Sequence, residues 1–291
     1  ISRAIYYSVF HSVSAFCNAG FSIWSDGLVR YVDSPIVNFS ITGLIILGGL
    51  GFTVIIDVYR NLFVFEKIKK LTLHTKIVLL TTACLCLMGF VALFVTEYHS
   101  SMEGFSFTRR LLSSWFQSVT TRTAGFNTVD ISKFSSASVL VTIVLMFIGA
   151  SPGSTGGGIK TTTFTVLVLS VVSMLRGKRD LTIFNRKIPS DNAREATSLL
   201  ILSGSIVLAV VFVMMLVEPF AFERILFEAI SAFGTVGLSM GITADLSYHG
   251  KALITLLMYI GRIGPLTLIY ALSMSKKQPN INFAEEKIAI G

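Results

Sequence analysis

The chain has 291 residues, with 24 lysines and arginines against 16 aspartates and glutamates, so its formal net charge is +8. Hydrophobic residues make up 53% of the sequence and charged residues only 14%, whereas ordinary soluble domains carry about 25% charged residues. Together with a mean hydropathy of +0.74, this composition excludes a soluble globular enzyme and a disordered chain.

Five apolar runs are each long enough to cross a bilayer as a helix, which takes about 20 residues. Backbone amides in lipid need partners within the segment, so these runs are predicted to be helices. The expected fold class is therefore an all-α polytopic membrane protein. The runs cover residues 36–56, 77–96, 136–159 with a continuation over 161–175, 196–217 and 252–275.

Most of the basic residues gather in three segments, 57–76, 176–194 and 276–291. Because these segments flank apolar spans, the positive-inside rule places them in the cytoplasm. The alternative, a nucleic-acid-binding patch, is disfavoured for the same reason, so no nucleic-acid partner is expected.

A shorter apolar piece, residues 109–121, lies between two of the long runs. As a helix it would be about 20 Å long, too short for a hydrocarbon core of ~30 Å. Both flanking basic segments face the cytoplasm, so the stretch 97–135 must be external. The piece is therefore predicted to be a re-entrant helix that dips in from outside and returns as a loop.

This pattern of a short helix followed by a glycine-containing loop occurs three times, at residues 10–22, 115–127 and 227–239. Re-entrant backbone is tolerated at membrane depth only when it is buried in protein or lines a watery cavity. Glycine permits backbone conformations that turn successive carbonyls towards one axis, and such carbonyls can replace the hydration shell of a cation. The alternative is that these glycines only end helices at packing sites.

The run at 136–159 contains a glycine-rich break, residues 149–160, which also includes Pro152. This composition cannot support a continuous lipid-exposed helix, and such breaks are expected beside a cavity. A static kink is the alternative. The segment differs from a phosphate-binding loop because Ile159 separates Gly158 from Lys160.

Arg262 lies near the middle of the last apolar run. A charge at this depth is costly, so its side chain is expected to face the pore interior or a partner. The alternative is an ordinary structural pair with a carbonyl or an acid.

Seven sequence motifs together resemble the Ktr/Trk/HKT superfamily of potassium transporters, and they are most similar to its bacterial Ktr membrane subunits. The resemblance covers essentially the whole chain. The motifs are SAFCNAGFS (14–22), GGLGFTV (48–54), LHTK (73–76), TTRTAGFNTVD (120–130), GASPGSTGGGIKTTTF (149–164), SAFGTVGLSMGIT (231–243) and GRIGPLTL (261–268).

The resemblance implies pseudo-fourfold repeats of helix, pore loop and helix around a central pore, with three pore loops visible. Residues 1–72 would be the second repeat without its first helix, 73–187 the third with a broken inner helix, and 188–275 the fourth. Residues 276–291 would be a cytoplasmic tail. A first repeat, and the first helix of the second, are expected to precede Ile1.

The resemblance also implies the functional residues. A selectivity filter made of backbone carbonyls would bind K⁺, because all three loops keep the glycine whose replacement by serine is associated in the family with sodium permeation. Arg262 would project below the filter as an electrostatic barrier. The filter residues would be Cys17, Asn18, Ala19 and Gly20, then Arg122, Thr123, Ala124 and Gly125, then Gly234, Thr235, Val236 and Gly237. The mobile gate loop beneath them would be Gly149, Ala150, Ser151, Pro152, Gly153, Ser154, Thr155, Gly156, Gly157, Gly158, Ile159 and Lys160.

The expected function is K⁺ uptake across the bacterial plasma membrane, with or without coupling to sodium, and not an enzymatic reaction. The pore loops would face outside. The resemblance further implies a homodimer, embedded in lipid, on a cytosolic nucleotide-binding ring of the RCK/KTN type. ATP or ADP would bind that partner, and this chain would hold no cofactor. The alternative, a membrane enzyme or anion exporter holding phosphate at the break, is disfavoured because no acid/base set is visible.

Overall fold

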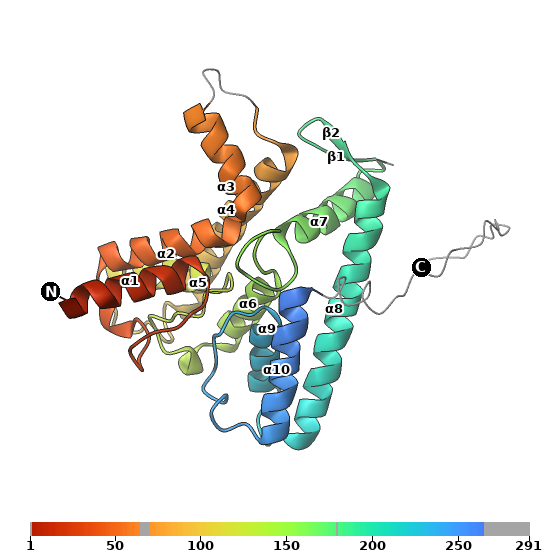
Figure 1. Cartoon of the computed structure of the whole chain (residues 1–291). Coiled ribbons are helices and arrows are strands. Elements are labelled where there is room, and N and C mark those ends of the chain that lie inside the picture. The colour runs from red at the N-terminus through yellow and green to blue at the C-terminus, as the bar shows by residue number, and fades with distance from the viewer. Residues whose placement is uncertain (1, 65–69, 179, 265–291) are drawn as a thin grey trace.

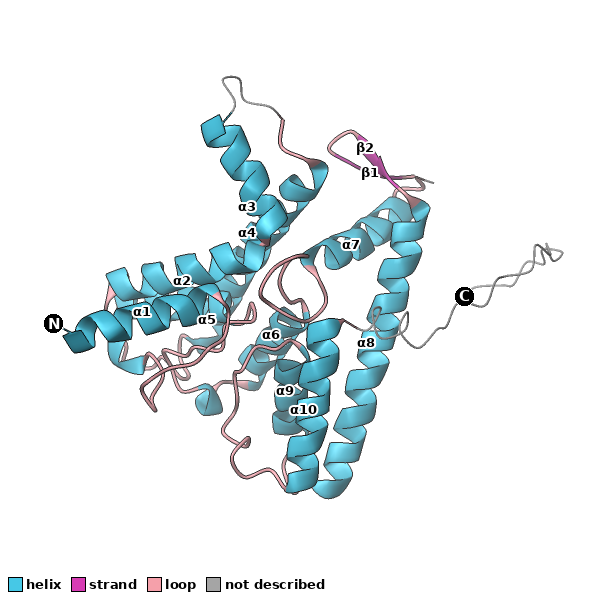
Figure 2. Ribbon diagram, in the orientation of Figure 1, coloured by secondary structure: helices cyan, strands magenta, loops and turns pink. Residues whose placement is uncertain are grey.

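The structure is a computed structural model that describes residues 2–64, 70–178 and 180–264. Helices make up almost all of its regular structure, and the strands within these residues form one short hairpin (Figure 2). The predicted tail at 276–291 lies outside the described residues. The helices are α1 (Ser2–Phe16), α2 (Pro35–Leu50), α3 (Phe52–Tyr59), α4 (Leu73–Glu97), α5 (Phe107–Thr120), α6 (Ser136–Phe147), α7 (Thr161–Leu175), α8 (Ser190–Val217), α9 (Phe222–Phe233) and α10 (Tyr248–Ile263), and the hairpin strands are β1 (Leu181–Ile183) and β2 (Arg186–Ile188).

Two single helices among the described residues, α4 and α8, are long and apolar enough to cross a membrane. The predicted continuous span over 36–56 is wrong, because α2 and α3 meet at Gly51 and are bent by 100°. Gly51 has φ +88°, a conformation that glycine adopts readily and that ends a right-handed helix. Of the run predicted at 252–275, the described part is helical to Ile263.

A three-part order recurs along the chain: short helix, irregular loop, apolar helix. It is formed by α1 and α2, by α5 and α6, and by α9 and α10. Figure 1 shows α1, α2 and α5 together on one side of the molecule and α8, α9 and α10 together on the other. The loops that follow α1, α5 and α9 reach the region between these two groups.

Two buried carboxylates fix the last two of these units in the same way. Glu97, at the end of α4, accepts hydrogen bonds from the backbone N–H and the hydroxyl of Ser135 at 2.9 and 2.8 Å. Glu218, which follows α8, accepts the same pair from Ser247 at 3.1 and 2.5 Å. Ser135 and Ser247 are the N-caps of α6 and α10, so each acid ties the end of one long helix to the start of the next apolar helix.

The core is divided between the two groups of helices. Phe227 and Phe233 of α9 are fully buried with Met146 and Met214 in the larger cluster. Phe116 of α5 belongs to the second cluster, against α1 and α2.

The outer face of α8 is apolar and exposed: Ile201, Leu208, Phe212 and Leu216 are each more than 60% accessible. Lipid is the solvent that such a surface fits. The chain is therefore an all-α polytopic membrane protein.

Candidate functional site: three glycine loops and a gate segment

The loops after α1, α5 and α9 share one backbone pattern. We call them loop A (residues 17–20), loop B (122–125) and loop C (234–237). In each, a residue with positive φ stands two positions before a glycine with positive φ. The pairs are Asn18 (φ 50°) and Gly20 (71°), Thr123 (71°) and Gly125 (82°), and Thr235 (52°) and Gly237 (87°).

Each short helix ends through a hydrogen bond from its loop back to its last turn. The N–H of Ala19 donates to Ser14 O at 2.9 Å, that of Ala124 to Thr120 O at 3.0 Å, and that of Val236 to Ser231 O at 2.8 Å. In loops A and C this is the six-residue closure of a helix C-terminus in which a left-handed residue reverses the chain. In all three loops, the backbone therefore turns at the same point after the short helix.

The three loops lie side by side, and their glycines touch. A Cβ atom added to Gly20 would lie 2.5 Å from Ala124 O and 3.0 Å from the Cα of Gly125. One added to Gly125 would lie 2.5 Å from Val236 O and 3.5 Å from the Cα of Gly237. Each of the first two glycines thus packs against the carbonyl that precedes the glycine of the next loop, so the relation repeats from loop A to B and from B to C.

This close approach explains why loops A and B hold glycine at these positions. Both Gly20 and Gly125 have positive φ, which disfavours other residues, and a side chain would collide with backbone that has no freedom to move aside. The arrangement brings the carbonyls of Ala124 and Val236 into the seam between neighbouring loops. Rings of backbone carbonyls are one of the ligand sets that proteins use for alkali cations.

The side chains of two left-handed residues connect loops A and B. The Asn18 amide lies 3.1 Å from Thr123 Oγ1. When the amide is turned so that its nitrogen donates to Ala15 O and Ile45 O, its oxygen accepts from the Thr123 hydroxyl. Asn18 and Thr123 are both buried. The bond therefore joins the first two loops across 105 positions of sequence.

Residues 149–160, which we call the gate segment, form a closed loop between α6 and α7. Its two ends pair through a parallel bridge between Ile148 and Ile159, where the N–H of Ile159 donates to Phe147 O at 3.1 Å. We call this paired base of the loop its neck. Next to the neck, the N–H of Ala150 donates to Gly157 O at 3.3 Å. Figure 1 shows the segment as the loop between α6 and α7 at the middle of the molecule.

One side of the gate segment is held by the bent pair α2/α3. The N–H groups of Ser151 and Thr155 donate to Gly49 O and Gly48 O at 3.0 and 3.3 Å. In return, the N–H of Phe52, the first residue of α3, donates to Gly153 O at 3.1 Å. The bend of the α2/α3 pair therefore accommodates the tip of the segment, Pro152 and Gly153.

The segment also contacts loops B and C. Arg122 Nη2 donates to Gly149 O at 2.9 Å, and the N–H of Gly157 donates to Thr235 Oγ1 at 2.9 Å. Gly156 lies so close to Thr123 that an added Cβ would overlap the hydroxyl. The segment is therefore seated directly on the residues that precede the loop glycines.

Two basic side chains donate to carbonyls of the segment, Arg262 from α10 and Lys160 from the segment itself. Arg262 of α10 donates from Nη1 to the carbonyl of Thr155. Lys160 Nζ donates to Gly156 O at 2.7 Å. Arg262 thus has a carbonyl partner inside the break, and it connects the last described helix to the gate segment.

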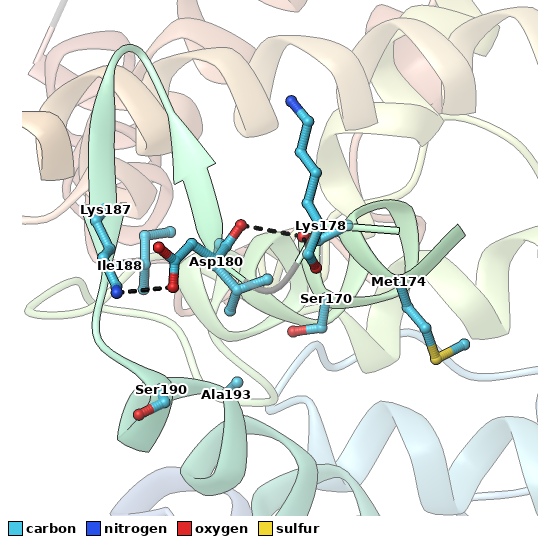
Figure 3. Close-up of a pocket in the computed structure, with 10 residues that line it drawn as sticks. Ser170, Met174, Lys178, Asp180, Lys187, Ile188, Ser190 and Ala193 are labelled. Atoms are coloured by element: carbon cyan, nitrogen blue, oxygen red, sulfur yellow. Dashed lines mark hydrogen bonds and ion pairs between the residues drawn. The ribbon is translucent and has the colours of Figure 1, made fainter. Parts of the chain in front are cut away.

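A basic hairpin follows α7. Asp180 pairs with Lys187 at 2.7 Å across its base, and Ser173 Oγ donates to Asp180 O at 3.1 Å. These residues line a pocket of about 390 Å³ between the hairpin and the start of α8. Figure 3 shows Lys187 directed towards Asp180 and Lys178 extending away from it. Buried Ile188 packs with Ala196 of α8, so the hairpin rests on the helix that follows it.

Several residues that shape the site went unassigned in the sequence. Gly48, Gly49 and Gly51 contact the gate segment, and their spacing within an apolar run is a recognised signal of a break or a close backbone approach. No sequence pattern indicates that the Arg122 side chain contacts the gate segment. Its hydrogen bond to Gly149 O becomes visible only in the fold. No group of three His, Cys, Asp or Glu side chains among the described residues has the geometry to hold a metal ion.

Comparison with known proteins adds a family and several relatives. The family described as TrkH, cation transport protein, matches residues 2–284. The chain is 42% identical, over 99% of its length, to the Ktr system potassium uptake protein B of Vibrio alginolyticus. It is 41% identical over its full length to the protein of the same name from Bacillus subtilis, and 38% identical to the potassium/sodium uptake protein NtpJ of Enterococcus hirae.

These alignments cover 63%, 64% and 65% of the three relatives, so the chain spans just under two thirds of their length. Among solved structures, the potassium transporter TrkH of Vibrio parahaemolyticus superposes with a TM-score of 0.78. That alignment covers 92% of this chain and 58% of the other. At 18% identity the likeness concerns the fold.

Proposed function

Because this chain belongs to the TrkH family of cation transport proteins, we propose that it carries K⁺ across the bacterial plasma membrane. The relatives named above are potassium uptake proteins, and one is a potassium/sodium uptake protein. The membrane potential would drive K⁺ inward, with or without coupling to sodium.

One observation carries this proposal: the contact of Gly20 with loop B and of Gly125 with loop C. A cation leaving water needs several oxygen ligands at once, and three adjacent loops can supply backbone carbonyls from one side of an axis. The filter would consist of loops A, B and C, with backbone carbonyls as the ligands.

The gate segment is proposed to obstruct the path beneath the filter. Its tip at Pro152 and Gly153 lies against the α2/α3 bend, and its neck is closed by the bridge between Ile148 and Ile159. Opening would displace residues 149–160 away from loops B and C. The hydrogen bonds from Arg122 and to Thr235 would then break.

Arg262 is proposed to slow permeation in the resting state. Its guanidinium lies against the gate segment through the Thr155 carbonyl, and it places a positive charge where K⁺ would emerge. Coulomb repulsion between like charges is large wherever water is scarce, so this charge would oppose the passage of K⁺. Because Arg262 is bonded to the segment, displacement of the segment would move this charge together with the gate.

The regulatory partner is proposed to be a cytosolic nucleotide-binding ring of the RCK/KTN type, which holds ATP or ADP while this chain holds neither. The name Ktr system, borne by two relatives, denotes more than one component. Two basic segments would meet the ring. One of them follows α3, and the first residue of α3 donates a hydrogen bond to the tip of the gate segment. The other is the β1/β2 hairpin, which is connected to the gate segment along the chain through α7. The basic segments would face the cytoplasm and the pore loops the outside, and two copies would form a homodimer on one ring.

Uptake of ⁸⁶Rb⁺ into proteoliposomes that hold the full-length protein tests the proposal, with Rb⁺ as a substitute for K⁺. We expect uptake that excess K⁺ abolishes and an equal concentration of Na⁺ leaves largely intact. Liposomes with the ring subunit should respond to a change from ADP to ATP. Uptake that is absent, or that Na⁺ and K⁺ suppress equally, would contradict a K⁺-selective pathway.

A further inference from the structure

A small, partly enclosed cavity lies beside loop B, between α2, α4 and the start of the gate segment. Its volume is about 10 Å³, which is room for about one water molecule. Its polar lining comes from Arg122, Thr82 and Cys86, and Ala150 of the gate segment closes one side. The remaining wall consists of Ile45, Ile46 and Gly49 of α2.

Two polar atoms at this cavity lack a partner. Arg122 Nη1 and Thr82 Oγ1 make no hydrogen bond within residues 2–64, 70–178 and 180–264. Arg122 is only 6% exposed and Thr82 only 9%. Buried polar groups in folded proteins are nearly always satisfied by protein or by ordered water. Each of these two atoms therefore calls for a partner, and both residues line the same cavity.

The charge of Arg122 narrows the choice of molecule. None of the ion pairs between described residues includes Arg122, so its guanidinium depends on neutral acceptors. A cation would be repelled by the guanidinium, and the volume suits a single water. Water can accept from Arg122 Nη1 and still donate to, or accept from, the Thr82 hydroxyl.

The other side of the same guanidinium holds the gate segment. Arg122 Nη2 donates to the carbonyl of Gly149, the first residue of the segment, at 2.9 Å. The residue next to Thr82 is bonded to the helix that follows the segment: Thr81 Oγ1 lies 2.6 Å from Thr165 Oγ1 of α7. Of two adjacent threonines of α4, one therefore contacts α7, and the other lines the same cavity as Arg122, which bonds the first residue of the segment.

We propose that one resident water molecule bridges Arg122 Nη1 and Thr82 Oγ1, and that this bridge makes Arg122 the positioning residue that anchors the start of the gate segment. The bridge orients the guanidinium so that its second nitrogen stays on Gly149 O. The water site stands on the structure alone, whereas its effect on flux rests on the proposed gate.

The water itself is tested by a density map of the full-length wild-type protein, at a resolution that shows ordered water. We expect one peak within hydrogen-bonding distance of both Arg122 Nη1 and Thr82 Oγ1. A map that shows no peak there, or that shows Nη1 bonded to another protein group, would overturn the water site.

The anchoring role is tested by Thr82→Val, which keeps the shape and removes the hydroxyl. Thr82→Ser, which keeps a hydroxyl, is the rescue variant. Thr142→Val is the matched control, because Thr142 of α6 is also buried and its hydroxyl also lacks a partner among the described residues, but it does not line the cavity. The readout is amide hydrogen exchange of residues 149–160, together with ring-independent ⁸⁶Rb⁺ flux.

Thr82→Val should speed exchange in the gate segment roughly two- to tenfold, the range that one lost hydrogen bond produces. Thr82→Ser and Thr142→Val should leave exchange at the wild-type rate. Unchanged exchange in Thr82→Val, or equal acceleration in Thr142→Val, would overturn the anchoring role. Faster exchange without any change in flux would support the anchor and contradict the gate that we propose for residues 149–160.

Discussion

The backbone N–H of Gly157 donates to the hydroxyl of Thr235 at 2.9 Å, and this bond joins the gate segment to loop C. Thr235 has positive φ, which is unusual for a β-branched residue and is strained unless neighbours hold it. The bond helps to hold this conformation, because it joins the Thr235 hydroxyl, and not a carbonyl of loop C, to the gate segment. The proposed filter and the proposed gate are therefore expected to respond to each other.

The first prediction concerns Gly125, a glycine of the proposed filter that packs against loop C. Gly125→Ser should lower the ratio of K⁺ to Na⁺ permeation by about tenfold, as a loss of about 1.4 kcal/mol of discrimination would produce. The new side chain would press on Val236 O and separate loop B from loop C. Competition of Na⁺ with ⁸⁶Rb⁺ uptake measures the ratio.

Gly43→Ser on α2 is the control for that variant, because a Cβ at Gly43 meets no atom within 4 Å. It should leave the ratio unchanged. If Gly125→Ser transports with the wild-type ratio, the carbonyls of loop B do not select the ion.

The second prediction concerns the seat of the gate segment. In Gly157→Ala the new methyl group would lie 2.6 Å from Thr235 Oγ1, so the segment could not rest on loop C. Flux without the ring should rise roughly fivefold, the effect of about 1 kcal/mol lost from the closed state. Gly204→Ala on α8, where an added Cβ meets nothing within 4 Å, should behave as wild type. Equal basal flux in both variants would argue against residues 149–160 as a gate.

The third prediction separates charge from packing at Arg262. Arg262→Gln should raise K⁺ flux roughly three- to tenfold, because about 1 kcal/mol of repulsion on the path of the ion is removed. Arg262→Lys retains the charge and should stay within about twofold of the wild type. Stopped-flow flux in proteoliposomes would resolve the three proteins. A Gln variant that is no faster than the Lys variant would exclude an electrostatic barrier.

The fourth prediction concerns stability. Glu97 is fully buried, and its carboxylate accepts from Ser101 N, Ser135 N and Ser135 Oγ. Glu97→Gln replaces one acceptor oxygen with an NH₂ donor that faces N–H groups. The free energy of unfolding should fall by about 2 kcal/mol. The thermal unfolding midpoint in detergent should fall by several degrees. Glu103→Gln, at an exposed position, should leave it unchanged, and an equal midpoint in both variants would contradict the helix-tying role of Glu97.

The sequence was sufficient for features that depend on local composition. The short helix predicted at 109–121 corresponds to α5, and the glycine-rich break falls between α6 and α7. Length and hydropathy determine such elements, because a span needs a minimum number of apolar residues and a break needs glycine or proline.

Features that depend on tertiary contacts could not be predicted in this way. The bend at Gly51 was missed because the apolar character of the run was given more weight than its glycines, and its contact with Gly153, about a hundred positions away, depends on the fold. The pairing of Glu97 with Ser135 and the reach of Arg122 to Gly149 likewise join distant segments. Repeats indicated that the three loops are alike, but only the fold brings Gly20, Gly125 and Gly237 into contact.

The most direct test of the central claim is anomalous diffraction from crystals of the full-length protein grown in rubidium. The account predicts rubidium peaks on one axis, within coordination distance of the backbone oxygens of loops A, B and C, and it predicts that these peaks persist when an equal concentration of sodium is present. Peaks that lie away from these oxygens, or no peaks between the loops in a map that resolves them, would contradict it.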